Sequence, residues 1–383
     1  MQWSSSTGEP VIYWLIYIVL TLILTICGHK ISSLRVKLKQ IKIAIFAGIF
    51  YSLVEGLRWL RGADYYHYYS DLAFNFNSIF STQDPEILYK LWVNLFYHSG
   101  FPPELGFVIY SMLFIFGVLL IFLEYPRAAK WGLPMIFLLL NTITENIIRQ
   151  YIAISFILLA YFFYLKGHQK KMIAMLCIVP FIHTSGMIAV LLFLIFAYVP
   201  IKLKSPVILV AIYVAAYFLW SPKWLDNIVP YLQLISLNGN DKMQAYLDYS
   251  DRWFTTEGIN GENYASSFLL TLSTIVVYSS AIYYGFKACL KEHKMQVIFY
   301  FSYFGILIKV LSSGIEIISR IADWTYWMVP ILMGLALTES SFLRKKTISV
   351  IVGISYFLYF IYYGIIVSMR ELPYAGCGFI WDK

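Results

Sequence analysis

The chain has 383 residues, of which 60% are hydrophobic and only 13% are charged. Soluble domains carry about 25% charged residues, so this composition excludes a soluble globular protein and indicates a polytopic membrane protein. The formal net charge is +8, but no aqueous segment concentrates the basic residues on one face, which excludes a nucleic-acid-binding function.

The apolar runs predict an all-α protein with about twelve membrane-spanning helices in a single polytopic domain, residues 1–383. The first ten residues contain no Lys or Arg, so we expect no cleaved signal peptide. The sixth span is short, and we expect it to form a broken or re-entrant pair with the seventh around His183. The predicted spans cover residues 11–28, 41–57, 104–123, 131–145, 148–165, 172–182, 186–201, 206–220, 266–286, 296–312, 325–340 and 347–367.

The distribution of charge predicts the orientation in the membrane. Six short loops, at 29–42, 126–130, 166–171, 202–204, 287–296 and 341–346, carry 18 of the 29 Lys and Arg residues. Basic loops face the cytoplasm, so both termini and the two long loops at about 58–103 and 221–265 are expected on the outer side. We expect these long loops to contain short helices that lie on the membrane, for example at 224–237.

The two long outer loops are rich in aromatic residues, including Tyr65, Tyr68 and Tyr89 in the first and Trp253 in the second. Aromatic planes beside Asp, Asn and Arg suit the apolar faces and hydroxyls of sugar rings. The alternative is the aromatic belt that any membrane protein places at the interface. We interpret the loops as a saccharide surface, with Trp253 as a substrate-binding residue.

Metal chemistry finds no support in the sequence. The cysteines, at 27, 177, 289 and 377, form no Cys-x-x-Cys pair, and the six histidines are scattered without ligand spacing. The sequence therefore predicts neither a disulfide nor a metal site.

Arg149 lies in the stretch Thr144–Ala153, which is predicted to open a helix that runs to Leu165. Glu145 precedes it by four residues, the spacing of an intrahelical ion pair, and Glu316 and Arg320 repeat that spacing. A charge at a membrane boundary is costly, and an arginine there can bind a phosphate through two donors. A purely structural pair remains the alternative for both arginines.

His183 is followed by Thr184, Ser185 and Gly186, a break between two apolar runs on the predicted outer side. Histidine is the usual general base near neutral pH, although a lone histidine at such a place is often only a packed core residue. Asp64 is the second candidate base, with sugar binding or an ion pair to Arg61 as alternatives. Lys309, inside an apolar run, either joins this site or extends to the interface.

Several short motifs occur in a fixed order and on the same predicted side of the membrane. Together they resemble the EpsG/Wzy family of bacterial polysaccharide polymerases over about residues 11 to 375. Two departures are Ala63, where the family pattern has Thr, and the segment Ile-Ala-Asp-Trp-Thr-Tyr after Arg320. The motifs are Arg58-x3-Gly62-x-Asp64-Tyr65-x2-Tyr68, Glu86-x2-Tyr89, Arg149-Gln150-x2-Ala153, His183-x-Ser185, Arg320 and Leu372-Pro373-Tyr374.

The resemblance implies a glycosyltransferase of the bacterial cytoplasmic (inner) membrane. It would transfer a growing glycan from undecaprenyl pyrophosphate to a lipid-linked oligosaccharide repeat unit on the outer face, without a cofactor or metal. Its candidate partners are the chain-length regulator, flippase and ligase of the same pathway. We assign catalysis to His183, Arg149 and Asp64. The expected substrate-binding residues are Arg58, Arg61, Glu86, Glu145, Gln150, Arg320 and Trp253.

Other functions are compatible with the same sequence. The alternatives are a flippase or transporter of the lipid-linked saccharide, a ligase or other lipid-linked glycosyltransferase, and a membrane acyltransferase that also uses an intramembrane histidine. Transporters often show two repeated halves with interrupted helices at matching positions, and this sequence shows no such halves.

Overall fold

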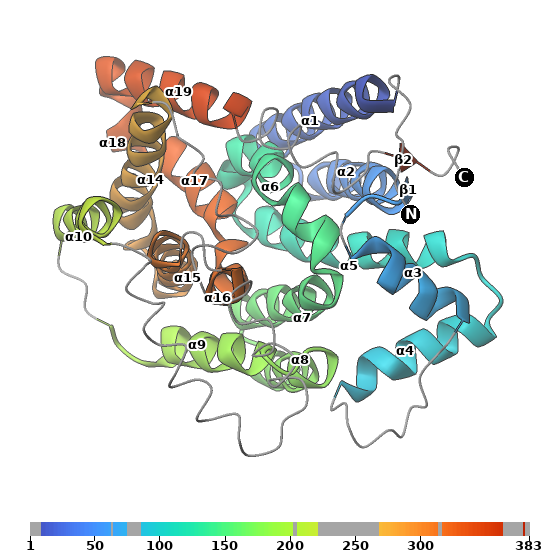
Figure 1. Ribbon diagram of the computed structural model, residues 1–383. Coiled ribbons are helices and arrows are strands. Elements are labelled where there is room, and N and C mark those ends of the chain that lie inside the picture. Colours follow the sequence, from blue (N-terminus) through green and yellow to red (C-terminus); the bar gives the residue numbers. More distant parts are fainter. Residues whose placement is uncertain are drawn as a thin grey trace.

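The computed structural model describes residues 9–62, 64–74, 86–201, 205–220, 268–312, 316–362 and 378–379. It is built almost entirely of helices, as predicted, with one two-stranded sheet in the described part (Figure 1). The predicted helix at 224–237, Trp253 and the segment Leu372–Tyr374 lie outside the described residues. The helices are α1 (Glu9–Ser33), α2 (Lys37–Gly56), α3 (Tyr65–Phe74), α4 (Ile87–His98), α5 (Pro103–Glu124), α6 (Pro126–Asn146), α7 (Ile148–Leu165), α8 (Gln169–Ile182), α9 (Gly186–Tyr198), α10 (Pro206–Leu219), α14 (Phe268–Cys289), α15 (His293–Leu311), α16 (Glu316–Tyr326), α17 (Val329–Leu337), α18 (Ser340–Leu343) and α19 (Lys346–Ile361), and the strands are β1 (Arg58–Trp59) and β2 (Gly378–Phe379).

A multi-pass helical membrane protein follows from the length and hydropathy of these helices. Five of the described helices are long and apolar enough to cross a bilayer: α1 from Val11, α5, α7, α14 and α15. Three shorter apolar helices, α9, α10 and α19, lie among them. The total of twelve spans stays a prediction.

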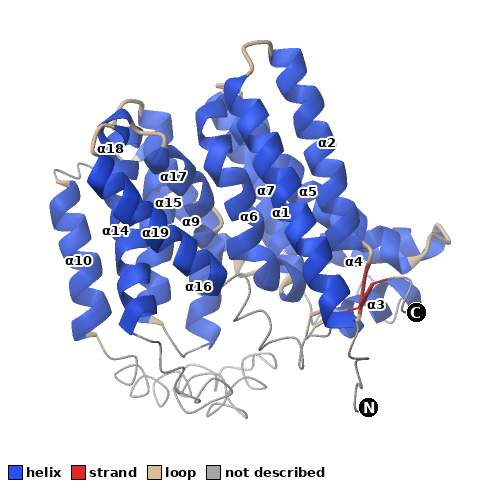
Figure 2. Ribbon diagram, turned by 90° about the horizontal axis from the view of Figure 1, so that it is seen from above, coloured by secondary structure: helices blue, strands red, loops and turns tan. Residues whose placement is uncertain are grey.

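Polar contacts define two ends of the helical bundle (Figure 2). At one end, Lys37 at the start of α2 and Lys166 after α7 both pair with Glu124 at the end of α5, at 3.5 and 2.7 Å. At the other end lie the short helices α3 and α4 and the sheet formed by β1 and β2. The basic loops that the structure describes therefore gather at one end, which we call the basic end, and the long loops begin at the opposite end, the polar-loop end.

Small residues bring the central helix α6 close to its neighbours. Gly28 of α1 packs on the backbone carbonyl of Ala129, and Gly334 of α17 packs on that of Ala128. A side chain at either glycine would collide with that carbonyl, so the two helices approach α6 on adjacent positions of its surface. This packing puts α6 between α1 and α17 (Figure 1).

The structure corrects two predicted helix boundaries. Helix α6 ends at Asn146 and α7 begins at Ile148, with Ile147 between them at φ −99° and ψ 57°. Glu145 and Arg149 therefore belong to different helices and not to one helical face. The predicted span 325–340 also begins inside α16, because the helix is interrupted at Trp327 and Met328 and resumes in α17.

Candidate active site

Glu86 is the centre of a polar cluster at the polar-loop end. It immediately precedes α4 and is only 3% exposed. Its Oε2 lies 2.8 Å from Nη1 of Arg149 at the start of α7, and its Oε1 lies 3.1 Å from Nδ1 of His183. The backbone N–H of Thr184 donates to the same Oε1 at 3.2 Å. One carboxylate thus joins the segment before α4 to the start of α7 and the end of α8.

These contacts keep Glu86 ionised. Burial alone raises the pKa of a carboxyl, but the hydrogen bond from His183, the charge of Arg149 and the N–H of Thr184 together outweigh burial and lower the pKa of Glu86 to about 2. An ionised carboxylate only accepts hydrogen bonds, so Nδ1 of His183 carries the hydrogen that it shares with Glu86.

Two tyrosine rings flank Arg149. Its guanidinium carbon lies 5.9 Å from the ring centroid of Tyr68 and 5.4 Å from that of Tyr89. The Tyr89 hydroxyl is fixed in turn, because it donates to Asp71 at 3.0 Å. Arg149 is held in one orientation while 27% of its side chain stays exposed. Its Nε–H is buried and has no hydrogen-bond partner within the described part of the chain.

His183 lies at the turn between α8 and α9, beside the indole of Trp324 on α16. The two ring centroids are 5.4 Å apart in an edge-to-face arrangement, and 28% of the histidine side chain is exposed. The neutral imidazole with its hydrogen on Nδ1 carries a lone pair on Nε2. No hydrogen bond to that nitrogen comes from any residue that the structure describes. This tautomer is the one a general base requires.

Three other predicted site residues lie beside this cluster. Asp64 sits at the start of α3, where its backbone carbonyl accepts a hydrogen bond from Tyr68 at 3.2 Å. Burial raises the pKa of Tyr68, and the Asp64 charge also raises it, while Arg149 lowers it. Gln150 donates to the backbone carbonyl of Arg320 at 3.1 Å, which connects α7 with α16.

Arg61 and Glu145, by contrast, form a separate cluster in the interior. The Arg61 side chain is fully buried, and its Nη2 lies 3.4 Å from Oε1 of Glu145. The rings of Tyr13, Tyr17 and Phe379 surround the guanidinium at 4.5 to 5.5 Å. The alternative of an ion pair between Glu145 and Arg149 is therefore wrong, because Glu145 pairs with Arg61.

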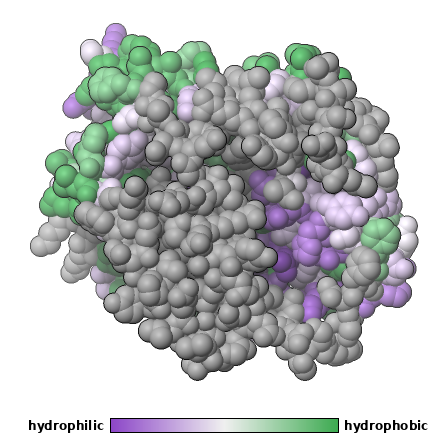
Figure 3. Space-filling model, viewed as in Figure 1, coloured by the Kyte–Doolittle hydropathy of each residue, from purple (hydrophilic) through white to green (hydrophobic). Residues whose placement is uncertain are grey.

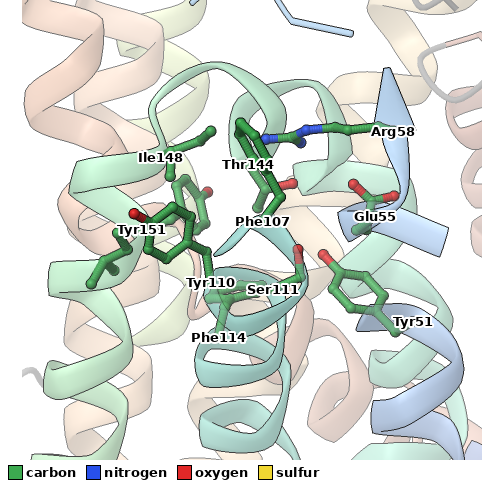
Figure 4. A pocket seen from close by; sticks show the side chains of 11 residues that line it. Tyr51, Glu55, Arg58, Phe107, Tyr110, Ser111, Phe114, Thr144, Ile148 and Tyr151 are labelled. Carbon is green, nitrogen blue, oxygen red and sulfur yellow. The ribbon is translucent and has the colours of Figure 1, made fainter. Parts of the chain in front are cut away.

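Arg58 reaches a small polar pocket between α2, α5, α6 and α7 (Figure 4). Arg58 is 3% exposed and its guanidinium lies 5.2 Å from the ring centroid of Phe107. Figure 4 shows Arg58, Glu55 and Tyr51 on one side of the pocket and Ile148 and Tyr151 of α7 on the other. The cavity volume is about 20 Å³, enough for one or two water molecules.

A further ion pair, between Lys309 and Asp323, joins α15 to α16. Lys309 of α15 contacts Asp323 at 2.7 Å and donates to Ser319 Oγ at 2.8 Å, both on α16. The sequence interpretation did not name Asp323. The available signal was an aspartate between apolar residues, four residues before Trp327 and fourteen after Lys309.

Part of the described surface at this end is hydrophilic. Figure 3 shows a patch of hydrophilic residues to the right of its centre, on the face of Figure 1. Within the described ranges, no group of three or more His, Cys, Asp or Glu side chains is arranged to hold a metal ion. The side chain of Glu316 and the whole of Trp253 lie outside the described residues, so their predicted roles stay predictions.

A multi-pass helical membrane protein with a Glu–His–Arg cluster at its polar-loop end is the class that this fold and site define. Comparison with known families identifies the family within this class. The model of the EpsG family matches residues 41–375, and the chain belongs to that family. The chain matches no curated protein and no solved structure. The match begins after α1 and ends before β2, so Tyr17 and Phe379 around Arg61 both lie outside it.

Proposed function

We propose that this protein is a polysaccharide polymerase, a glycosyltransferase of the bacterial inner membrane. It transfers a growing glycan from undecaprenyl pyrophosphate to a lipid-linked repeat unit on the outer face. The observation that carries this proposal is Glu86, which orients a histidine and an arginine in one half-exposed site at the polar-loop end. Family membership supports the same class of protein.

The reaction uses these two side chains for opposite tasks. An acceptor sugar hydroxyl attacks C1 of the donor sugar, and the bond from C1 to the pyrophosphate oxygen breaks. Nε2 of His183 takes the hydroxyl proton, while the charge that develops on the departing pyrophosphate lies against Arg149. The bond to pyrophosphate is already activated, so no nucleotide enters this step.

Arg149 suits a pyrophosphate because part of its guanidinium is bound and part is still available. Glu86 fixes Nη1, and the two tyrosine rings restrict the plane of the group. The side chain stays 27% exposed, and a phosphate oxygen can approach the guanidinium on that exposed part. A planar fork of this kind binds phosphate through two parallel hydrogen bonds, which a lysine cannot reproduce.

The other residues have supporting roles in this proposal. Asp64 is the second candidate base. Gln150, Arg320, Arg58 and Trp253 bind the saccharide or its phosphates, whereas Arg61 and Glu145 stabilise the fold beneath the site. Glu86 acts through His183 and Arg149, and is a positioning residue.

The test is incubation of the purified protein in vesicles with a synthetic lipid-pyrophosphate repeat unit, without ATP or an ion gradient. A ladder of products spaced by one repeat supports a polymerase. Transfer of the glycan to another acceptor without a ladder would indicate a ligase. Movement across the bilayer without chain growth would indicate a flippase and contradict the proposal.

Variants assign the roles within the same assay. We expect His183→Ala to slow chain growth by about 10²–10⁴-fold and Arg149→Ala by about 10²–10³-fold. Arg149→Lys should be nearly as slow, because the charge stays but the fork is lost. Arg127→Lys, an exposed arginine at the basic end, is the matched control. Full chain growth by Arg149→Lys would contradict the bidentate contact.

A further inference from the structure

Helix α4 carries an uncovered apolar stripe. Ile87, Leu91 and Leu95 follow one another at four-residue spacing and are 48%, 39% and 62% exposed. The opposite face, with Tyr89 and Phe96, is buried against the rest of the protein. This is the pattern of a helix that packs on protein with one face and meets an apolar medium with the other.

Both ends of α4 lie at the polar-loop end of the helical bundle. Glu86, which precedes the helix, bonds to the outer ends of α7 and α8 through Arg149 and Thr184. After the helix, the chain continues directly into α5 at Pro103, which also starts at the polar-loop end. A helix of 12 residues is about 18 Å long, so α4 lies across the ends of the spans rather than along them (Figures 1 and 2).

The stripe continues the surface that a bilayer would cover. Helix α4 packs against α8, and Phe181 near the outer end of α8 is 49% exposed. Tyr97 in the last turn of α4 and Phe101 after the helix add further exposed rings, 43% and 56%. Lys90, the charged residue of α4, is buried and does not interrupt the stripe.

We propose that α4 lies in the outer leaflet of the membrane, with Ile87, Leu91 and Leu95 inserted among the lipids. Interfacial helices of this type place their apolar face at the boundary between head groups and acyl chains. The inference rests on the multi-pass architecture and not on the enzymatic activity.

One consequence does rest on the proposed function. Glu86 stands at the first turn of α4, so the Glu86–His183–Arg149 cluster lies at the depth of the lipid head groups. The pyrophosphate of a lipid-linked glycan occupies that depth while its hydrocarbon chain stays in the bilayer. The substrate would then reach Arg149 by lateral diffusion, without leaving the membrane.

The experiment measures depth with nitroxide labels on the full chain in phospholipid vesicles. Cys27, Cys177, Cys289 and Cys377 are first replaced by alanine, and single cysteines are then introduced at Leu91 or Leu95. Leu22 on α1, which is 56% exposed on a predicted span, gives the lipid reference. Lys170 in a basic loop gives the water reference. Relaxation by oxygen, which concentrates in the bilayer, is compared with relaxation by a water-soluble nickel complex.

We expect the labels at Leu91 and Leu95 to behave like the label at Leu22, accessible to oxygen and protected from nickel. Behaviour like that at Lys170 would overturn the proposal, since α4 would then face water. Protection from both reagents would also overturn it, because protein would cover the stripe. The measurement needs no substrate, so a failed polymerisation assay and a failed depth assay remain distinguishable.

Discussion

A single carboxylate, that of Glu86, holds two side chains with opposite tasks. It contacts the proposed base at 3.1 Å and the proposed phosphate ligand at 2.8 Å. Loss of this carboxylate would affect both at once, although Glu86 itself touches neither reacting atom in the proposed step. The same contacts also make the fold sensitive to acid.

Glu86 should contribute pH-dependent stability. Its pKa is about 2 in the folded protein and near 4.5 without the fold. A lowered pKa stabilises the folded state above the unfolded value, by on the order of 3 kcal/mol, and this stabilisation disappears as the pH falls from about 4.5 to 2. We expect Glu86→Gln to remove that part of the acid dependence. Thermal unfolding in detergent between pH 2 and 7 checks this, and identical pH profiles of the two proteins would contradict it.

The Tyr17 hydroxyl lies between two carboxylates, those of Glu55 and Glu145, and can donate its single hydrogen to either of them. It lies 2.5 Å from Oε1 of Glu145 and 3.2 Å from Oε1 of Glu55, both buried. Arg61 supplies one positive charge and pairs with Glu145. We therefore infer that the Arg61 charge stabilises Glu145 directly, whereas Glu55 depends on the hydrogen bond from Tyr17.

This inference predicts different effects for two identical substitutions. Glu55→Gln should change the free energy of unfolding by less than about 1 kcal/mol, since the amide oxygen of glutamine can accept the same hydrogen bond from Tyr17. Glu145→Gln should cost about 3–5 kcal/mol, because Arg61 becomes an unpaired buried charge. Thermal stability of the two variants in detergent provides the comparison. Equal losses, or a larger loss for Glu55→Gln, would contradict the different roles of the two carboxylates.

Sequence reasoning named the residues of the site better than their partners. Arg149, His183 and Glu86 were singled out, but the local spacing of Glu145 and Arg149 suggested a pair that does not exist. The real partner of Arg149 lies 63 residues away, and the contact between Thr184 and Glu86 spans 98 residues. No helical periodicity encodes such contacts. The break at Ile147 also lacks the proline or glycine that usually marks a helix end.

The segment between β1 and α3 depends on one glycine. Gly62 has φ of +95°, and a Cβ at this position would lie 2.6 Å from the backbone carbonyl oxygen of Glu145. The loop that carries Arg58 and Arg61 can therefore pack on the end of α6 only without a side chain here.

Gly100, at the end of α4, provides a matched control. It also has positive φ, +71°, but nothing lies within 4 Å of its would-be Cβ. We expect Gly100→Ala to cost about 1 kcal/mol from backbone strain alone. Gly62→Ala should cost at least about 2 kcal/mol more, by analogy with overpacked cores. Thermal unfolding of both variants measures the difference, and equal losses would show that the loop can shift away from Glu145.

Helix α16 shows why the boundary between α16 and α17 was not predicted from the sequence. Lys309 anchors it to α15 through Ser319 and Asp323, and α16 brings Trp324 to His183. The run 325–340 looked continuous because its residues are apolar on both sides of the break. Pro330, in the first turn of α17, was the available sign of a new helix.

For the whole molecule, the basic end and the polar-loop end are expected on opposite sides of the membrane, and this orientation can be tested by labelling. We expect cysteines near Lys37, Lys170 and Lys345 to react only from the cytoplasmic side, and cysteines at 66–74 and 225–262 only from outside. Labelling of right-side-out and inverted vesicles with a membrane-impermeant maleimide tests this. Reaction of residue 240 from the cytoplasmic side alone would invert the orientation and place the Glu86 cluster on the wrong face.

Much of the overall architecture could be predicted because membrane helices can be recognised in a sequence by their length and hydropathy. Each predicted apolar range overlaps a described helix, and the basic loops within the described residues lie together at one end. The arrangement of the helices around α6 could not be predicted, since it depends on Gly28 and Gly334 meeting particular carbonyl groups. Such complementarity is a property of two surfaces together, not of either sequence segment.

The pairing of β1 with β2 has a consequence for biosynthesis. Arg58 and Trp59 pair with Phe379 and Gly378, and the Phe379 ring lies 4.5 Å from the Arg61 guanidinium. Arg61 leaves the ribosome near the beginning of translation, whereas Phe379 emerges after every predicted span has been made. The newly inserted chain must therefore carry an incompletely covered cation throughout its synthesis. Premature termination upstream of β2 would leave that cation uncovered, a feature by which quality-control proteases could distinguish unfinished chains from finished ones.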